Sequence, residues 1–176
     1  MPPQVRVTRE AIIDKAFELT REYGFDKVTA RMLASELNCS TQPVYHVFRN
    51  MDELKYEVYL KTKDYFDKYM LRKSPDKNTP FVLGMGLRYI DLAQKEKNLF
   101  RLLNTPDSGR RLKSLYDLAD DYSSDIDPDT FIKTWIFSHG IASIVVSDET
   151  KISKKEIKKL LTDAEMSFYT YGKDKQ

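Results

Sequence analysis

The stretch LNCSTQPVYHVF, residues 37–48, carries several hydrogen-bonding side chains and contains neither Asp nor Glu. Thr41 and Gln42 fall where a short helix would begin, and Tyr45 and His46 follow one turn later. Gln can form two hydrogen bonds with adenine, and Thr can bond a base edge or touch a thymine methyl group. Tyr and His can donate to phosphate oxygens. Because carboxylates would repel phosphates, an acid-free segment of this composition is typical of a surface that contacts DNA.

The elements around this stretch predict how it is positioned. Thr8 can cap a first helix that ends at Gly24, and Thr29 can cap a short second helix, ARMLASEL. The tight turn NCS leads to a third helix capped by Ser40 or Thr41, with a proline in its first turn. Two short helices joined by a tight turn and supported by a longer helix form the helix-turn-helix arrangement.

Three further side chains can hold the DNA backbone in this arrangement. Thr29 and Arg31 begin the second helix, and Lys55 follows the start of the fourth. Each of the singled-out residues also has a simpler interpretation. Thr41 can be only a cap, Tyr45 can belong to the core, and His46, Arg31 and Lys55 can be solvated surface groups.

The remainder of the chain also follows a helical period, and strand signals are absent apart from the short run IASIVV, which sits inside that period. Asn50 with Glu53, and Ser153 with Glu156, have the spacing of capping boxes at the starts of a fourth and a ninth helix. Intermediate helices are expected to about residue 147, among them a seventh over residues 109–122. The prediction is an all-α fold of about nine helices: a helix-turn-helix domain over residues 1–50 and a bundle of longer helices over residues 51–176.

Composition limits the other classes of protein. The 176 residues are 41% hydrophobic and 32% charged, which is typical of a soluble globular chain. No apolar run reaches the roughly 20 residues of a membrane span, and one cysteine fits a reducing cytosol. One Cys and two His make a metal site improbable, and no nucleophile–base pair or glycine-rich phosphate loop indicates an enzyme. No cofactor is expected. Since the net charge is only +2, the evidence for nucleic acid is local.

Residues 8–54 resemble the DNA-binding region of the tetracycline-repressor (TetR) family. The resemblance is carried by YGFDKVT, LASELNCS and VYHVFRNMDEL, although Met51 stands where a Lys is common. It implies an all-helical, homodimeric, cytoplasmic bacterial regulator of a palindromic operator, usually a repressor released by a small ligand. The residues it implies near bases are Thr41, Gln42, Pro43 and Tyr45. The residues it implies near phosphates are Thr29, Arg31, Tyr45, His46 and Lys55.

The C-terminal region offers a weaker resemblance. WIFSHGIAS, residues 135–143, is similar to a Trp-x-x-x-His-Gly signature found in one group of this family. A mostly apolar effector pocket with a few polar tips is expected there, for a hydrophobic or amphipathic molecule. Its candidate lining is Phe81, Met85, Tyr89, Phe100, Leu103, Tyr116, Trp135 and His139. The alternative is that these side chains form only core.

The last two helices carry apolar faces that one small domain would struggle to cover. In the resembling family such helices form a four-helix dimer interface, and a two-fold operator demands a two-fold protein. The candidate interface residues are Phe131, Ile141, Val145, Ile157, Leu160, Leu161, Ala164 and Phe168, with a core role as the alternative. A rival hypothesis for the whole chain is a helix-turn-helix protein that binds other proteins instead of DNA; it predicts that Thr41→Ala and Gln42→Ala are tolerated.

Overall fold

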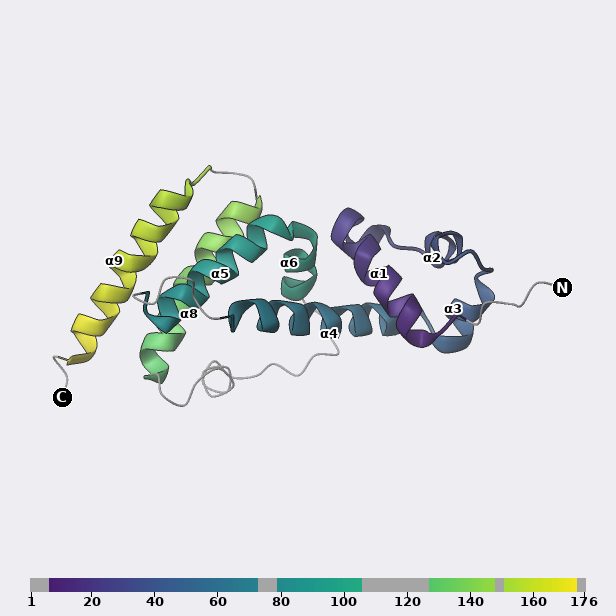
Figure 1. The fold of residues 1–176 in the computed structure, drawn as a ribbon, viewed down its shortest axis with the longest axis horizontal. Helices are drawn as coiled ribbons and strands as arrows, with labels where there is room; N and C mark the ends of the chain where they lie inside the picture. The colour runs from purple at the N-terminus through teal and green to yellow at the C-terminus, as the bar shows by residue number, and fades with distance from the viewer. Residues whose placement is uncertain (1–6, 73–78, 106–126, 148–150, 174–176) are drawn as a thin grey trace. The chain divides into compact units, whose positions relative to one another are not determined.

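The computed structural model describes residues 7–72, 79–105, 127–147 and 151–173, the last five by backbone alone. These ranges hold eight α-helices and one 3₁₀ helix, and no strand, so the all-α prediction is confirmed (Figure 1). The expected helix over residues 109–122 lies outside the described residues. The elements are α1 (Arg9–Tyr23), η1 (Phe25–Lys27), α2 (Ala30–Glu36), α3 (Gln42–Val47), α4 (Met51–Met70), α5 (Phe81–Lys95), α6 (Lys97–Asn104), α8 (Pro128–Ser147) and α9 (Lys154–Lys173).

The helices group into two compact units. The first unit comprises residues 1–65 and 96–105, and the second comprises residues 66–95 and 106–176. Helix α4 begins in the first unit and ends in the second. The division near residue 50 that the sequence predicts stays a prediction.

In the first unit, α1 and α2 start, and α1 ends, at the residues that the sequence predicts. The Thr8 hydroxyl accepts a hydrogen bond from the Ala11 N–H, and the Thr29 hydroxyl accepts one from the Met32 N–H, each at 3.2 Å. Gly24 ends α1 with a φ of 84°, a conformation that costs a glycine little because it has no Cβ. These caps fix where α1 and α2 start, and they set the direction in which the chain enters α2.

Helix α3 begins differently from the prediction. The hydroxyl of Thr41 makes no capping hydrogen bond, and its backbone is already helical, with φ of −72° and ψ of −14°. A capping side chain needs an extended backbone to reach the next turn, so Thr41, one of the two caps expected for this helix, does not act as one. The Thr41 carbonyl instead accepts from the Val44 N–H at 3.1 Å and the Tyr45 N–H at 3.3 Å. The Thr41 hydroxyl is therefore left for contacts outside the helix.

A single hydrophobic cluster fixes the helices of the first unit. Ile12 on α1, Leu33 on α2, Val44 on α3 and Leu54 on α4 are all buried in it, with Phe48 closing the end of α3. Residues on one helix face contribute because they recur three or four positions apart. This core presses α2 and α3 against α1 and leaves the opposite side of α3 exposed.

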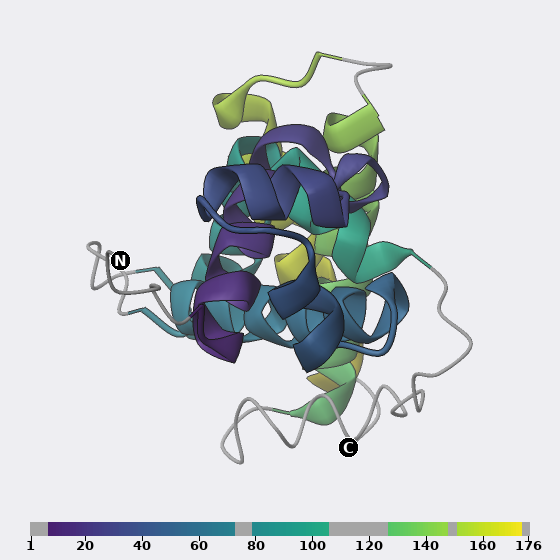
Figure 2. The same ribbon diagram turned by 90° about the vertical axis from the view of Figure 1, so that its right-hand side faces the viewer.

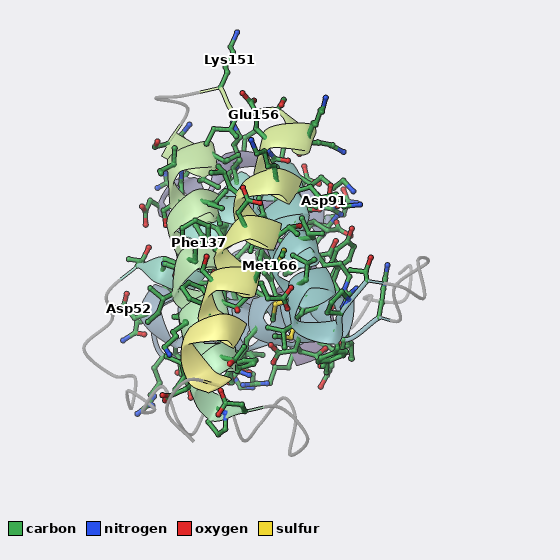
Figure 3. The ribbon with its side chains drawn as sticks, turned by 90° about the vertical axis from the view of Figure 1, so that its left-hand side faces the viewer. Asp52, Asp91, Phe137, Lys151, Glu156 and Met166 are labelled. Atoms are coloured by element: carbon green, nitrogen blue, oxygen red, sulfur yellow. The ribbon has the colours of Figure 1, made fainter. Side chains whose placement is uncertain are left out.

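The second unit contains α5, α8 and α9, which pack against one another. Gly86 on α5 allows the closest approach, since a Cβ at this position would lie 2.5 Å from the hydroxyl oxygen of Ser138 on α8. Figure 3 looks onto α9 and α8, with Met166 on α9 and Phe137 on α8. At the start of α9, Ser153 and Glu156 exchange hydrogen bonds of 2.8 and 3.2 Å, so the predicted capping box is confirmed.

Helix α8 is long and apolar enough to cross a membrane by length and composition alone. A core helix passes the same test, because it too is covered with apolar side chains. Phe131, Ala142 and Val146 of α8 are buried within the second unit, and the helix packs against α5 and α9. Burial accounts for part of this apolar character, whereas Ile136 and Ile144 on the same helix are apolar and exposed.

Candidate nucleic-acid interface

Helices α2 and α3 are joined by a turn with a defined backbone. Asn38 adopts a φ of 50°, in the left-handed region where Asn is among the favoured residues. The Cys39 N–H then bonds the Ala34 carbonyl at 2.9 Å, which closes the end of α2. Figure 2 gives a second view of α1, α2 and α3. The two short helices and the supporting α1 have the order and the connection of a helix-turn-helix.

One face of α3 is exposed and the other is core. Val44 and Phe48 are each 1% exposed and anchor the helix. Gln42, Tyr45 and His46 are exposed, with Tyr45 at 57%, so the alternative that Tyr45 is a core residue does not apply. Positions three and four apart share a helix side, so these three side chains form one surface.

The remaining residues predicted near bases are less accessible. Thr41 and Pro43 are half-buried, at the end of α3 where the turn meets the helix. Thr41 supplies its carbonyl to the helix and keeps its hydroxyl, whereas Pro43 has only apolar ring atoms to offer. The arrangement can place a hydroxyl, an amide, a phenol and an imidazole along one helix edge, and this set suits hydrogen bonding to bases and phosphates.

The start of α2 supplies a second group of donors. Thr29 is exposed and keeps its O–H free to donate, because its oxygen accepts the capping bond from the Met32 N–H. Arg31 is exposed and forms no ion pair with any residue in the described ranges. A hydroxyl and an unpaired guanidinium at a helix N-terminus are suited to a phosphate, since the helix dipole adds positive potential there.

Lys55 has a different environment from these two residues. Its ammonium lies 3.6 Å from a carboxylate oxygen of Asp26 and 5.8 Å from the centre of the Phe25 ring. Its side chain is 24% exposed, so much of the stem is covered. A phosphate would have to compete with Asp26 for this ammonium, and the phosphate contact predicted for Lys55 stays a prediction.

Two basic residues beside this surface were missed by sequence reasoning. Arg49 directly follows α3 with an exposed side chain, and its Nε lies 3.2 Å from a carboxylate oxygen of Glu53. Lys27 is exposed and lies two positions before the cap of α2. The sequence could have indicated Arg49, since it directly follows the acid-free stretch 37–48. The position of Lys27 depends on the short η1 helix, which hydrophobic periodicity does not reveal.

In the second unit a small cavity lies among residues of α5 and α8. Its volume is about 10 Å³, roughly the space of one water molecule. Three of the predicted pocket residues, Met85, Tyr89 and Trp135, line it. A ligand of ordinary size would need these helices to separate, because ligand pockets begin at roughly 300 Å³.

The other predicted pocket residues lie elsewhere or on the edge of this cavity. Phe81 is 45% exposed at the start of α5, and Phe100 and Leu103 belong to α6 in the first unit. Tyr116 lies outside the described residues. His139 is not among the lining residues of the cavity. Its Nδ1 is hydrogen-bonded at 2.9 Å to the hydroxyl of Tyr89, which does line it.

His139 is the one imidazole in the described part of the second unit, and its surroundings are apolar on two sides. Its ring stacks on Trp135 with centroids 5.2 Å apart and planes inclined by 17°. Burial lowers the pKa of His139 below its usual value of 6.5, because the charged ring would lose hydration. Neutral His139 and the Tyr89 hydroxyl are thus the polar tips beside an apolar hollow. In the described ranges no group of three or more His, Cys, Asp or Glu side chains could hold a metal ion.

The residues predicted for a dimer interface divide into two groups. Five are buried within the protomer, namely Phe131, Ile141, Val145, Ile157 and Leu161. Ala164 and Phe168 are half-buried, and Leu160 is 42% exposed. For these five residues burial favours the alternative of a core role, since their side chains have little exposed surface with which to contact a partner chain.

An all-helical chain with an exposed, acid-free helix after a tight turn has the design of a helix-turn-helix DNA-binding protein. Residues 12–58 match the family model of the bacterial regulatory proteins of the tetR family. The match supports a place for the chain in that family, and it covers α2, α3 and parts of α1 and α4. No curated protein matches the chain.

Proposed function

We propose that the protein is a dimeric, cytoplasmic transcription regulator that represses from a palindromic operator and is released by a small hydrophobic or amphipathic effector. The observation that carries the proposal is the exposed, acid-free face of α3 within a segment that matches the tetR family model. Gln42 and Thr41 read base edges, Tyr45 reaches both bases and backbone, and His46 binds phosphate.

The start of α2 holds the flanking backbone in this proposal. Thr29 donates its hydroxyl proton to a phosphate oxygen, and Arg31 adds a guanidinium with no acidic partner in the described ranges. Contacts of this kind set the register of the protein on DNA without reading sequence. Sequence discrimination then falls to Thr41, Gln42 and Tyr45 on α3.

A dimer is supported by a stripe on α8 that the described part of the chain leaves exposed. Ile136 and Ile144 are 51% and 45% exposed, and Gly140 lies between them one turn from each. A Cβ at Gly140 would meet nothing within 4 Å in the described chain, so no internal contact requires glycine there. A helix from a second copy that packs on this stripe would explain the glycine, since small residues let two helix backbones approach closely.

The effector response is assigned to the cavity between α5 and α8. Binding would have to open a space that now holds about 10 Å³, and opening would move Tyr89 and Trp135 apart. Helix α4 contributes to both compact units, so it can carry such a shift toward α1 to α3. Ligand and operator would then weaken each other's binding by the same factor.

The test is selection of DNA fragments from the source genome by the purified protein at about 150 mM salt, where non-specific attraction is screened. The expected result is one enriched palindrome. A Thr41→Ala/Gln42→Ala variant should lose or relax that enrichment. A Gln94→Ala/Thr162→Ala variant, which removes the same two side-chain types from α5 and α9, should retain it.

If no DNA sequence is enriched, or if the Thr41→Ala/Gln42→Ala variant enriches the same sequence as strongly as the parent chain, α3 does not read DNA sequence. A helix-turn-helix that binds another protein would then become the better hypothesis. The thermal unfolding midpoints of both double variants should first be matched to that of the parent chain, so that lost binding is not lost folding.

A further inference from the structure

A hollow in the first unit has no lining residue from α3. It has a volume of about 260 Å³ and is lined by the end of α1, by η1, by Lys55 of α4 and by α6. Ligand pockets usually begin at roughly 300 Å³, so this groove suits a small molecule. We infer that it binds a small organic anion with a planar apolar body, such as an aromatic carboxylate.

The charges around the groove favour an anion. Lys27, Lys55 and Arg101 bring three cations from three different elements, against one acid, Asp26. The Asp26 side chain is 96% exposed, and its ion pair with Lys55 measures 3.6 Å. Water screens the pair on the Asp26 side, so the carboxylate of Asp26 is only weakly held there. An incoming carboxylate can therefore take the place of Asp26 beside Lys55.

The floor of the groove favours an apolar body behind the anionic group. Phe25 and Leu102 are buried beneath it, and Tyr23 is 43% exposed at its side. The Lys55 ammonium lies 5.8 Å from the centre of the Phe25 ring, so a positive charge and an aromatic surface are adjacent. A ring seated on the floor would bring a carboxylate on its edge within reach of a cation.

The walls of the groove are fixed before any ligand arrives. The Asn98 amide on α6 donates to the carbonyls of Arg21 and Glu22 at 3.1 and 3.0 Å, which ties α6 to the end of α1. Arg101 donates to the Asn98 side-chain oxygen at 3.2 Å, which directs the guanidinium along the same wall. A rigid site loses little conformational entropy on binding.

The inference goes beyond the proposed function and does not depend on it, because binding is measured without DNA. Isothermal titration of the full chain with 2-naphthoate should show one site per chain, and 2-naphthamide, its uncharged analogue, should bind about tenfold more weakly. Lys27→Gln and Arg101→Gln should each weaken naphthoate binding about threefold to tenfold. Asp26→Asn should strengthen it, since the competing carboxylate is gone.

The matched control is Lys158→Gln on α9, which makes the same change in net charge on the second unit. It should leave naphthoate binding unchanged. Absence of naphthoate binding, equal binding of the amide, or equal effects of Lys158→Gln and Arg101→Gln would overturn the inference. Naphthoate binding that survives both Lys27→Gln and Arg101→Gln would place the ligand elsewhere and overturn it as well. Circular dichroism of each variant shows that the fold is retained.

Discussion

The guanidinium of Arg21 on α1 and the carboxylate of Glu96, just before α6, form a two-point ion pair across 75 positions of sequence. Arg21 Nε lies 2.7 Å from Glu96 Oε2, and a second bond joins Nη2 to Oε1. Glu96 is only 6% exposed, and the Tyr65 hydroxyl lies 3.4 Å from its Oε1. The pair therefore fastens α6 to α1 within the first unit.

Removal of the arginine should destabilise the first unit. Arg21→Ala leaves the Glu96 carboxylate buried without its cation, which should lower the free energy of unfolding by about 1–3 kcal/mol. Arg21→Ala/Glu96→Leu should recover part of this loss, because the buried charge is removed together with its partner. Urea unfolding of the three chains measures both effects. Arg31→Ala, at an exposed position on α2, is the control, and a loss as large as that of Arg21→Ala would contradict the role of the pair.

His139 should make stability depend on pH. Burial lowers the pKa of His139, so the unfolded chain binds this proton more readily than the folded chain. Stability is therefore lost as the pH falls from the unfolded value near 6.5 through the lower folded pKa. The free energy of unfolding should therefore decline between about pH 7.5 and about pH 5.5.

The measurement compares the pH dependence of unfolding in two variants. His139→Asn should flatten the decline toward acid pH, whatever stability it loses from the Trp135 stack. His46→Asn is a matched control, since His46 is the other histidine of the chain and lies exposed on α3. An unchanged slope in His139→Asn would show that other groups produce the dependence.

Glu165 on α9 should limit stability at neutral pH. It is 5% exposed, one of its carboxylate oxygens has no partner in the described residues, and burial raises its pKa. The folded chain thus holds this proton more tightly, and stability falls as the pH rises from the unfolded value near 4.5 through the raised folded pKa. Glu165→Gln should raise the unfolding midpoint by about 2–4 °C at neutral pH.

The gain from Glu165→Gln should shrink when the same melts are repeated in acid, where the glutamic acid is already neutral. Glu156→Gln is the opposite control on the same helix. The hydrogen bonds from Ser153 lower the pKa of Glu156, so its charged form stabilises the fold above the unfolded pKa. That variant should lose stability at neutral pH, and a gain of equal size in both variants would indicate a general effect of reduced charge.

The sequence predicted the parts of the fold that depend on local chemistry. Thr8, Gly24 and Thr29 act at the helix ends where their side chains or backbone freedom predicted them. The absent cap at Thr41 could not be seen in the sequence, because Thr suits a cap by type and only its helical backbone prevents the bond. The apolar residues Val44 and Phe48 indicate the buried face of α3. The opposite, polar face, which forms the candidate interface, could therefore be predicted from the sequence.

The sequence could not predict which residues of different helices contact one another. The pairing of Arg21 with Glu96 depends on how α6 returns to α1, and no periodicity encodes that path. For the same reason, the residues of α8 that the sequence suggests for a dimer interface, Phe131, Ile141 and Val145, are all buried within the chain. Phe131 and Ile141 are apolar because they are core, whereas Ile136 and Ile144 are apolar and exposed, and hydrophobicity alone does not separate the two groups.

Gly86 on α5 and Gly140 on α8 should respond oppositely to the same substitution. Gly86→Ala places a Cβ 2.5 Å from the Ser138 hydroxyl oxygen, which donates to the Thr134 carbonyl at 2.7 Å and is held in place. The overpacked helices should lose about 1–3 kcal/mol of stability. Gly140→Ala meets nothing within 4 Å and should strengthen α8 by up to about 1 kcal/mol.

The same Gly140→Ala variant tests the proposed dimer. If a helix of a second copy lies on Ile136, Gly140 and Ile144, the added methyl group holds the two helices apart. The dimer should then dissociate at about tenfold higher concentration, a change worth about 1.4 kcal/mol. Sedimentation equilibrium measures the dissociation constant, and Ser147→Ala at the end of the same helix is the control for a small change on its exposed side. If the dissociation constant of Gly140→Ala is unchanged or lower, the dimer contact lies elsewhere. A more stable α8 does not by itself weaken a contact made by other residues.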